Sequence, residues 1–176
     1  MTKANIISAR LARHHLHAPL PDENGYLDLF RMLQPVSTLY YTCPGAPPCL
    51  GLRTVFDDRE LTARWRPGRK VVKGRFLGDG IGYVLADELE LYANAFRKAV
   101  SGLNENQQRV MDALRACGPL APRQIKEETG LLNKEIMPAL HRLQKAFMVF
   151  EDQSDSDWER PWCLFEEEWP AVELAD

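Results

Sequence analysis

The feature of this sequence that most restricts its fold is a pair of short β-like runs, Val71–Leu77 and Ile81–Leu85, that flank Gly78-Asp79-Gly80. An Asp-Gly pair between two such runs is a strong signal for a β-hairpin, because the tight turn needs residues with positive φ. The segments on both sides of the hairpin have helical periodicity. The chain is therefore predicted to be an α+β protein, mostly helical, in which a two-stranded hairpin stands between helices.

The segment that leads into this hairpin is strongly basic. Residues 59–75 contain seven Lys and Arg against one acid, Glu60, in a chain whose formal net charge is −3. Alternation along a strand places Arg69, Lys73 and Arg75 on one face. Such a row of cations either follows a phosphate backbone or forms an ordinary solvated face. The predicted nucleic-acid contacts of this region are Arg64, Arg66, Arg69, Lys70, Lys73 and Arg75.

Charge divides the chain into two parts. Residues 1–103 hold 14 Lys and Arg against 10 Asp and Glu, a net charge of +4, whereas residues 104–176 hold 8 against 15, a net charge of −7. We therefore expect a basic N-terminal domain, 1–103, that attracts anions, and an acidic C-terminal domain, 104–176, that does not.

The N-terminal domain has helical patterns on both sides of its hairpin. Helices are predicted over residues 5–17, 25–34 and 57–65, and a fourth runs from Asp87 to Gly102. Asp57 and Asp87 are the expected N-caps, and Gly102 is the expected left-handed residue at the end of the fourth helix. Helices, a hairpin and a covering helix in this order are typical of a winged helix.

The C-terminal domain repeats the same logic. Helices are predicted from the Asn104 cap to about Cys117, from Pro122 to Gly130, and around Ile136–Phe147. Pro138 complicates the third helix, whose start is expected at Asn133 or near Glu135. A second hairpin follows, with runs at 148–152 and 162–165. The chain is thus predicted to contain two tandem winged-helix units.

The third helix of the C-terminal domain is the candidate recognition helix, and it offers Lys134, His141, Arg142 and Lys145. The adjacent hairpin is acidic, and acids repel phosphate, so packing or protein contact is favoured over DNA reading for this unit. Its acids are Glu151, Asp152, Asp155, Asp157 and Glu159. The acidic tail Glu166–Glu168 with Trp169 is expected to be a solvated terminus or a clamp on a partner's basic face.

The sequence gives little support for a metal site, a cofactor site or a membrane span. His14, His15 and His17 are interpreted as a helix surface, because their spacing does not converge on one metal ion. The four Cys, at 43, 49, 117 and 163, have irregular spacing and predict neither a disulfide framework nor a zinc site. We expect a reduced, cytoplasmic protein without metal or cofactor, and no apolar run is long enough to span a membrane.

Several segments resemble the AlkZ/YcaQ family of winged-helix DNA glycosylases, and the chain looks like a short AlkZ-related member. The similar segments are Ser8–Leu16, Leu33–Ser37, Leu50–Arg53, Arg69–Arg75, Gly80–Asp87, Ala116–Ile125 and Leu140–Val149. The resemblance implies a scaffold that binds double-stranded DNA and, in the family, releases a modified or crosslinked base.

The resemblance also implies a catalytic position, which this chain fills only in part. Gln34 matches the first polar residue of the family's Gln-x-Gln or Gln-x-Asp motif and is the candidate catalytic residue. The second position is Val36, which neither accepts nor donates a proton, and Gly82 replaces a family histidine. We therefore predict a DNA-binding protein that lacks base-excision activity. The alternatives are a trimmed glycosylase that acts on alkylated or crosslinked DNA, and a protein-interaction module that does not bind nucleic acid.

Overall fold

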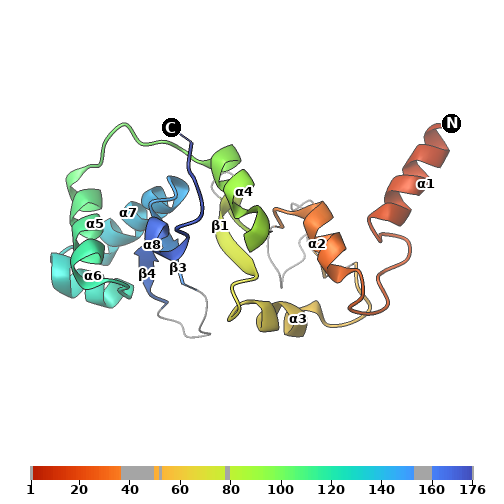
Figure 1. Ribbon diagram of the computed structural model, residues 1–176, viewed down its shortest axis with the longest axis horizontal. Coiled ribbons are helices and arrows are strands. Elements are labelled where there is room, and N and C mark those ends of the chain that lie inside the picture. The colour runs from red at the N-terminus through yellow and green to blue at the C-terminus, as the bar shows by residue number, and fades with distance from the viewer. Residues whose placement is uncertain (1, 37–49, 52, 78–79, 153–159, 176) are drawn as a thin grey trace.

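The computed structural model describes residues 2–36, 50–51, 53–77, 80–152 and 160–175. Within them the chain forms eight α-helices, one 3₁₀ turn and two separate two-stranded antiparallel sheets, which is the predicted α+β class. The N-terminal helices lie at one end of an elongated body, the C-terminal helices lie at the other, and the first hairpin lies between them (Figure 1). The predicted turn residues Gly78 and Asp79, the acids Asp155, Asp157 and Glu159, and Cys43 and Cys49 fall outside the described residues.

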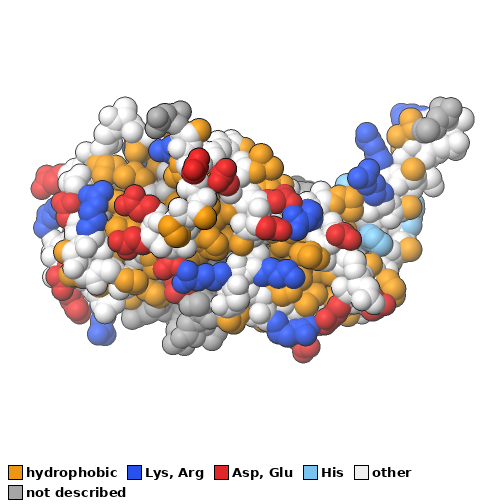
Figure 2. Space-filling view, in the orientation of Figure 1, with side chains coloured by type: hydrophobic (Ala, Val, Ile, Leu, Met, Phe, Trp, Pro, Cys, Tyr) orange, Lys and Arg blue, Asp and Glu red, His pale blue; other side chains and the backbone are white. Residues whose placement is uncertain are grey.

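Helix α1 (Lys3–Arg13) projects from the body (Figure 1). It ends four residues before the predicted end at residue 17, because His15 adopts a positive φ of 54° that a helix does not accommodate. None of its residues is buried. Residues 1–21 contain no Asp or Glu, and in Figure 2 the projecting helix shows basic and histidine side chains among apolar ones. The predicted helix is confirmed, and it is an arm rather than a part of the core.

Helices α2 (Tyr26–Leu33) and α3 (Asp58–Trp65) form the first core together with the hairpin. Asp57 caps α3 as predicted, since its carboxylate accepts a hydrogen bond from the Arg59 N–H at 2.9 Å. The side chains that α2 buries recur at steps of three and four residues and are Tyr26, Leu29, Phe30 and Leu33. This periodicity is the one from which the helix was predicted.

The first hairpin is confirmed, with β1 (Val71–Leu77) paired antiparallel to β2 (Gly80–Leu85). Its pairing runs from Val71 opposite Leu85 to Gly74 opposite Gly82, and the register then shifts before Leu77. Alternation gives the hairpin two buried faces. One face packs on α2 and α3 with Val71, Tyr83 and Leu85, and the other packs away from them with Val72, Phe76 and Val84.

The prediction of a helix from Asp87 to Gly102 is wrong at both ends. Asp87 lies inside a 3₁₀ turn, η1 (Ala86–Glu88), and its carboxylate binds Arg31 instead of capping a helix. Helix α4 (Leu89–Phe96) then ends before Arg97, and residues 97–103 connect it to the second half. The apolar stripe predicted for this helix therefore stops short of Val100.

The second half begins with three helices, α5 (Glu105–Cys117), α6 (Pro122–Thr129) and α7 (Asn133–Lys145). Asn104 and Gln107 form a reciprocal capping box at 2.9 Å in both directions, as expected for a strong helix start. Gly130 ends α6 in the left-handed conformation, with φ 67°. The predicted bounds of α5 and α6 are confirmed.

Helix α7 begins at Asn133, so the expected slip toward Glu135 does not occur, and Pro138 lies inside the helix. Its start is secured by the Glu135 carboxylate, which accepts a hydrogen bond from the Leu132 N–H at 2.8 Å. The second hairpin is confirmed as β3 (Val149–Glu151) paired with β4 (Trp162–Leu164). Leu120 adds an antiparallel bridge to Trp162.

The predicted solvated acidic tail is found only in part, because Glu166 and Glu167 are exposed whereas Glu168 and Trp169 are half-buried. Residues 165–168 form a short helix, α8 (Phe165–Glu168), whose Phe165 is buried. Trp169 packs edge-on against Phe150, with ring centroids 5.8 Å apart. Beyond it the tail lies beside α4, where Asn94 donates a hydrogen bond to the Glu173 carbonyl at 2.8 Å (Figure 1).

A third apolar cluster joins the two halves. The first half contributes α4 and the face of the β1–β2 hairpin that carries Val72, Phe76 and Val84. The second half contributes β3, α8 and Phe147, which follows α7. The buried members of the cluster are Val72, Phe76, Val84, Leu89, Ala93, Phe147, Phe150 and Phe165. Burial of apolar surface in this cluster holds the halves together, and we call the contact between the halves the seam.

Candidate nucleic-acid interface

Two of the predicted cations that precede β1, Arg64 and Lys70, contact side chains of their own half. Arg64 forms an exposed ion pair with Glu23 at 2.5 Å. The Lys70 ammonium lies 4.5 Å from the centroid of the Trp65 ring, within the range of a cation–π contact. Arg66 follows the end of α3 and is half-buried.

The cations of the row that the sequence predicts all reach across the seam to the second half. Arg69 forms an ion pair with Glu168 of α8, and Lys73 forms one with Glu151 of β3 at 2.6 Å. The Arg75 Nε donates a hydrogen bond to Gln144 Oε1 of α7 at 3.2 Å. All three cations therefore contact the protein's own second half, but Arg69 precedes β1 and has a positive φ of 51°, so strand alternation does not place it on one face with Lys73 and Arg75.

This placement gives the charge asymmetry of the sequence an internal role. The side chains of Lys73 and Glu151 are 15% and 18% exposed, so each ion has lost most of its water and depends on the other. Acidic and basic side chains are interspersed over the body in Figure 2 rather than gathered into one field. The positive first half and the negative second half complement each other along the seam.

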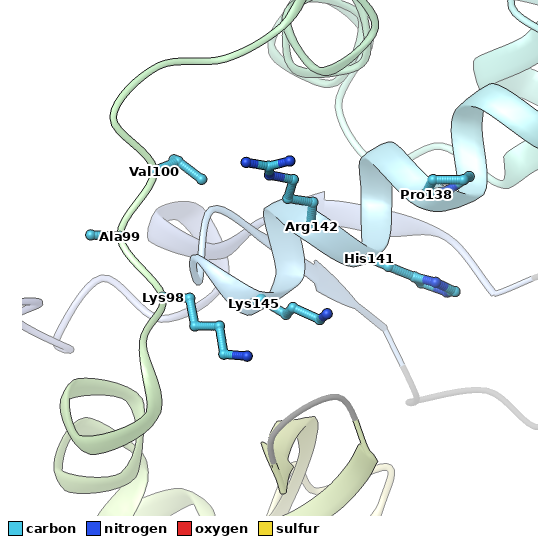
Figure 3. A pocket seen from close by; sticks show the side chains of 7 residues that line it. All are labelled: Lys98, Ala99, Val100, Pro138, His141, Arg142 and Lys145. Atoms are coloured by element: carbon cyan, nitrogen blue, oxygen red, sulfur yellow. The ribbon is translucent and has the colours of Figure 1, made fainter.

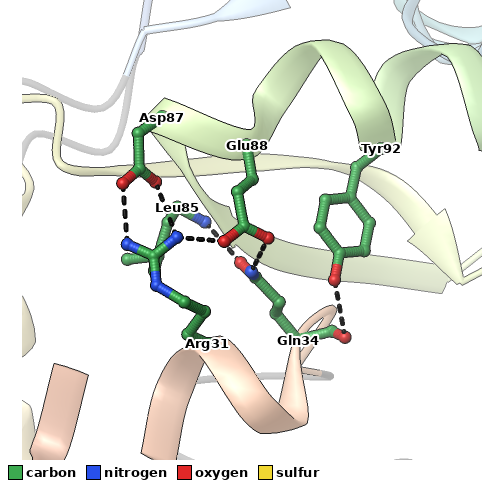
Figure 4. A network of polar contacts seen from close by, with 6 residues as sticks. All are labelled: Arg31, Gln34, Leu85, Asp87, Glu88 and Tyr92. Atoms are coloured by element: carbon green, nitrogen blue, oxygen red, sulfur yellow. Dashed lines mark hydrogen bonds and ion pairs between the residues drawn. The ribbon is translucent and has the colours of Figure 1, made fainter. Parts of the chain in front are cut away.

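Gln34, the candidate catalytic residue, lies in a polar network at the end of α2 (Figure 4). Its side chain accepts a hydrogen bond from the Leu85 N–H at 2.8 Å and donates one to the Glu88 carboxylate at 2.6 Å. Its backbone carbonyl accepts a hydrogen bond from the Tyr92 hydroxyl at 3.2 Å. Arg31 binds Asp87 and Glu88 in the same network.

The network holds α2 on β2 and η1. Gln34 is 8% exposed, and both ends of its amide are engaged by the chain's own atoms. Hydrogen bonds from Arg31 to Asp87 and Glu88 raise the pKa of its guanidinium further, so Arg31 stays charged at any ordinary pH. Val36, at the second motif position, is fully buried, and its backbone pairs with Tyr83. The arrangement is that of a structural clamp.

The cations of α7 lie on its outward face, beside the connection that leaves α4 (Figure 3). Lys134 and Arg142 are exposed, two turns apart, with exposed Pro138 between them. A cavity of about 570 Å³ opens at the C-terminal part of this face, and the Arg142 side chain points toward Val100 across it. The described residues that line it include no acid and are Lys98, Ala99, Val100, Pro138, His141, Arg142 and Lys145.

His141 points away from the pair formed by Lys98 and Lys145 (Figure 3). Burial, followed by the positive charge of Arg75, lowers the pKa of its imidazole below the ordinary value of 6.5. The nearby Glu151 opposes this shift, and Lys145 and Lys73 add to it. His141 is therefore a neutral hydrogen-bonding group at pH 7 in the middle of a positive region.

Two residues of this region were missed by sequence reasoning. Lys98 was expected on a helix that would extend to Gly102, and it reaches the cavity because that helix ends at Phe96. Gln144 was not singled out because a lone glutamine inside a helix has no local signal. Its place one turn from Leu140 and beside Leu143 on the buried stripe, where a polar residue is unusual, is the one sequence feature that could have found it.

Other classes of site receive no structural support within the described residues. They contain no group of three or more His, Cys, Asp and Glu that could hold a metal ion. None of the helices in this part of the chain combines the length and the apolar character needed to cross a bilayer. Neither the scan against models of known protein families nor the search of curated proteins gives a match for this chain.

Proposed function

We propose that this chain is a DNA-binding protein that contacts double-stranded DNA with the outward face of α7 and does not release bases. The observation that carries the proposal is the concentration of cations on that face. Arg142 and Lys145, with Lys98 from the connection, line a cavity whose described lining contains no acid, and exposed Lys134 lies two turns before Arg142 on α7, in a chain of net charge −3. A concentration of cations on one face of an acidic chain favours a polyanionic partner.

The finer fold that we propose is a winged helix, in two tandem units. It is supported in the second half by the order of α5, α6, α7 and the β3–β4 hairpin, with a left-handed Gly130 turn before α7. In such a unit the last helix enters the major groove. With 13 residues, α7 is about 20 Å long and presents its cations over about three turns.

Because the cations of the first half contact the second half, the proposed DNA contact lies on the second half and not on the first. Arg69, Lys73 and Arg75 bind side chains of the second half, so we assign them to the seam rather than to phosphate. The relation to AlkZ-type glycosylases remains part of the proposal and is supported by the motif similarities described above. The absence of base release is supported by the engagement of the Gln34 amide and by the apolar Val36.

The binding test is a fluorescence anisotropy titration of a labelled 20-bp duplex at several salt concentrations. Four phosphate contacts predict a slope of about −3.6 for log K against log salt. The double variant Lys134→Ala, Arg142→Ala should reduce that slope by about 2 and weaken binding alike for all sequences. The matched control is Lys126→Ala, which removes an exposed cation from α6 and should leave the slope unchanged. A salt-independent signal, or a double variant that binds like the parent, contradicts the proposal.

The proposed absence of base release is tested with a base-release assay on alkylated and on crosslinked duplex. We expect no release above the protein-free reaction. Release that disappears in Gln34→Ala but not in a folded control variant would instead establish the trimmed glycosylase. If the protein binds no DNA and elutes as a stable oligomer from a sizing column, the protein-interaction alternative is correct.

A further inference from the structure

A second cavity, of about 310 Å³, lies on the seam between the halves. It is separate from the cavity on the outward face of α7, and among the described residues His141 alone lines both. Strand β1, helix α7 and the ends of the β3–β4 hairpin surround it. The polar residues that line it are Lys73, Arg75, His141, Gln144, Glu151 and Arg160.

Gln144 is the residue that makes this cavity unusual. It is 3% exposed, and its Oε1 accepts a hydrogen bond from Arg75 Nε at 3.2 Å. Its Nε2 is buried and has no hydrogen-bond partner among the described residues. A buried donor without an acceptor is costly, and such a group in a native protein calls for an explanation. Because the Arg75 bond fixes which end of the amide is oxygen, the unpartnered end is a donor and requires an acceptor.

The described charges around the cavity also favour an anion. Its described lining holds three cations, Lys73, Arg75 and Arg160, against one carboxylate, Glu151. Glu151 already binds Lys73 at 2.6 Å and lies 3.8 Å from Arg160. The formal charge of the described lining is therefore +2, which favours an anion as the ligand.

We propose that this seam cavity binds a small oxyanion of the phosphate class, either inorganic phosphate or a phosphate monoester. The anion accepts a hydrogen bond from Gln144 Nε2 and lies among Lys73, Arg75 and Arg160. Tetrahedral oxyanions offer several acceptors at once, which suits donors that converge from a strand, a helix and a hairpin end. The volume corresponds to about ten water molecules, enough for such an anion with part of its hydration shell.

This site is independent of the proposed DNA contact and differs from it in a testable way. The DNA face is the outer side of α7, whereas the seam cavity is lined by the amide of Gln144, which is almost fully buried. A bound anion would join the two halves through Lys73 and Arg75 of the first and Gln144 and Arg160 of the second. The phosphate of a DNA backbone has the same chemistry, so the experiment must separate the two sources.

The test is calorimetric titration of the full chain with inorganic phosphate, without DNA, at an ionic strength held constant with sodium chloride. We expect one saturable site that chloride does not occupy. Gln144→Glu keeps an acceptor for Arg75 but places a negative charge beside the anion, and it should weaken phosphate binding at least tenfold, which corresponds to 1.4 kcal/mol. Arg160→Gln is the second variant, should Gln144→Glu fail to fold, and it should weaken phosphate binding severalfold.

The control is Lys134→Ala on the outer face of α7, which should weaken DNA binding and leave the phosphate affinity unchanged. Absence of a saturable phosphate signal overturns the proposal and means that water satisfies Gln144. A phosphate affinity that survives both Gln144→Glu and Arg160→Gln also overturns it. If Gln144→Glu impairs DNA binding while free phosphate does not bind, the cavity takes a backbone phosphate and the assignment to a free anion is wrong.

Discussion

The ion pair between Lys73 and Glu151 offers the sharpest test of the seam. Lys73 comes from β1 and Glu151 from β3, and the Lys73 Nζ donates to Glu151 Oε2 at 2.6 Å. Arg160 adds a weaker contact to the other carboxylate oxygen at 3.8 Å. The perturbations are Glu151→Gln, Lys73→Met and the double variant, with the free energy of unfolding as the measured quantity.

The two single variants should differ because they leave different charges behind. Exposed ion pairs contribute about 0–1 kcal/mol, and loss of one partner from a fully buried pair costs about 3–5 kcal/mol. At 15% and 18% exposure this pair lies between those limits. Glu151→Gln leaves Lys73 near Arg75 and Arg160 without a counter-ion and should cost about 2 kcal/mol. Lys73→Met leaves Glu151 beside Arg160 and should cost about 1 kcal/mol.

The double variant removes both charges and should cost about 1.5 kcal/mol, so the coupling energy is also about 1.5 kcal/mol. Urea unfolding followed by tryptophan fluorescence measures these values, because buried Trp162 pairs with Glu151 across the second hairpin. The control cycle uses the exposed pair of Arg123 and Glu127 on α6, whose coupling should stay below about 0.5 kcal/mol. Additive effects at the seam pair, or a costlier Lys73→Met, would refute the reasoning.

Three further outcomes are expected. Burial raises the pKa of Asp58 above 3.8 in the folded protein. The contribution of Asp58 to stability is therefore complete below pH 3.8 and is lost as the pH rises through its folded-state pKa. Asp58→Asn should make the urea midpoint change less between pH 4 and pH 7. Burial raises the pKa of Cys163 to about 12, so iodoacetamide at pH 8 should alkylate exposed Cys117 and spare Cys163 in the folded chain, as mapped by mass spectrometry. A Cβ at position 74 would lie 2.6 Å from the ring of fully buried Phe76, so Gly74→Ala should cost about 2 kcal/mol in thermal unfolding, and an unchanged midpoint would show that the ring has room to move.

Much of the fold could be predicted because its signals are local. The capping box of Asn104 and Gln107, the left-handed Gly130 and the two-residue alternation of β1 each act within a few positions. Helix ends were predicted less well where tertiary contacts decide them. Asp87 has the sequence of a cap, but a bidentate contact with Arg31, 56 residues away, uses its carboxylate.

The candidate site was harder to predict because charge alone does not name a partner. The excess of cations in the first half fits a nucleic acid outside the molecule as well as it fits the acids of the second half. The pairings of Lys73 with Glu151, 78 residues apart, and of Arg69 with Glu168, 99 residues apart, distinguish the two. Gln34 poses the same difficulty, since a glutamine that activates water and one that joins a helix to a strand look alike in sequence.

The seam also indicates where the chain could be divided into two fragments. Residues 97–103 connect the halves and carry none of the buried members of the shared apolar cluster. A backbone cut there would leave two fragments with complementary apolar surfaces and opposite net charges. Such fragments are suited to associate in solution without a covalent link, which is the property on which split-protein reporters depend.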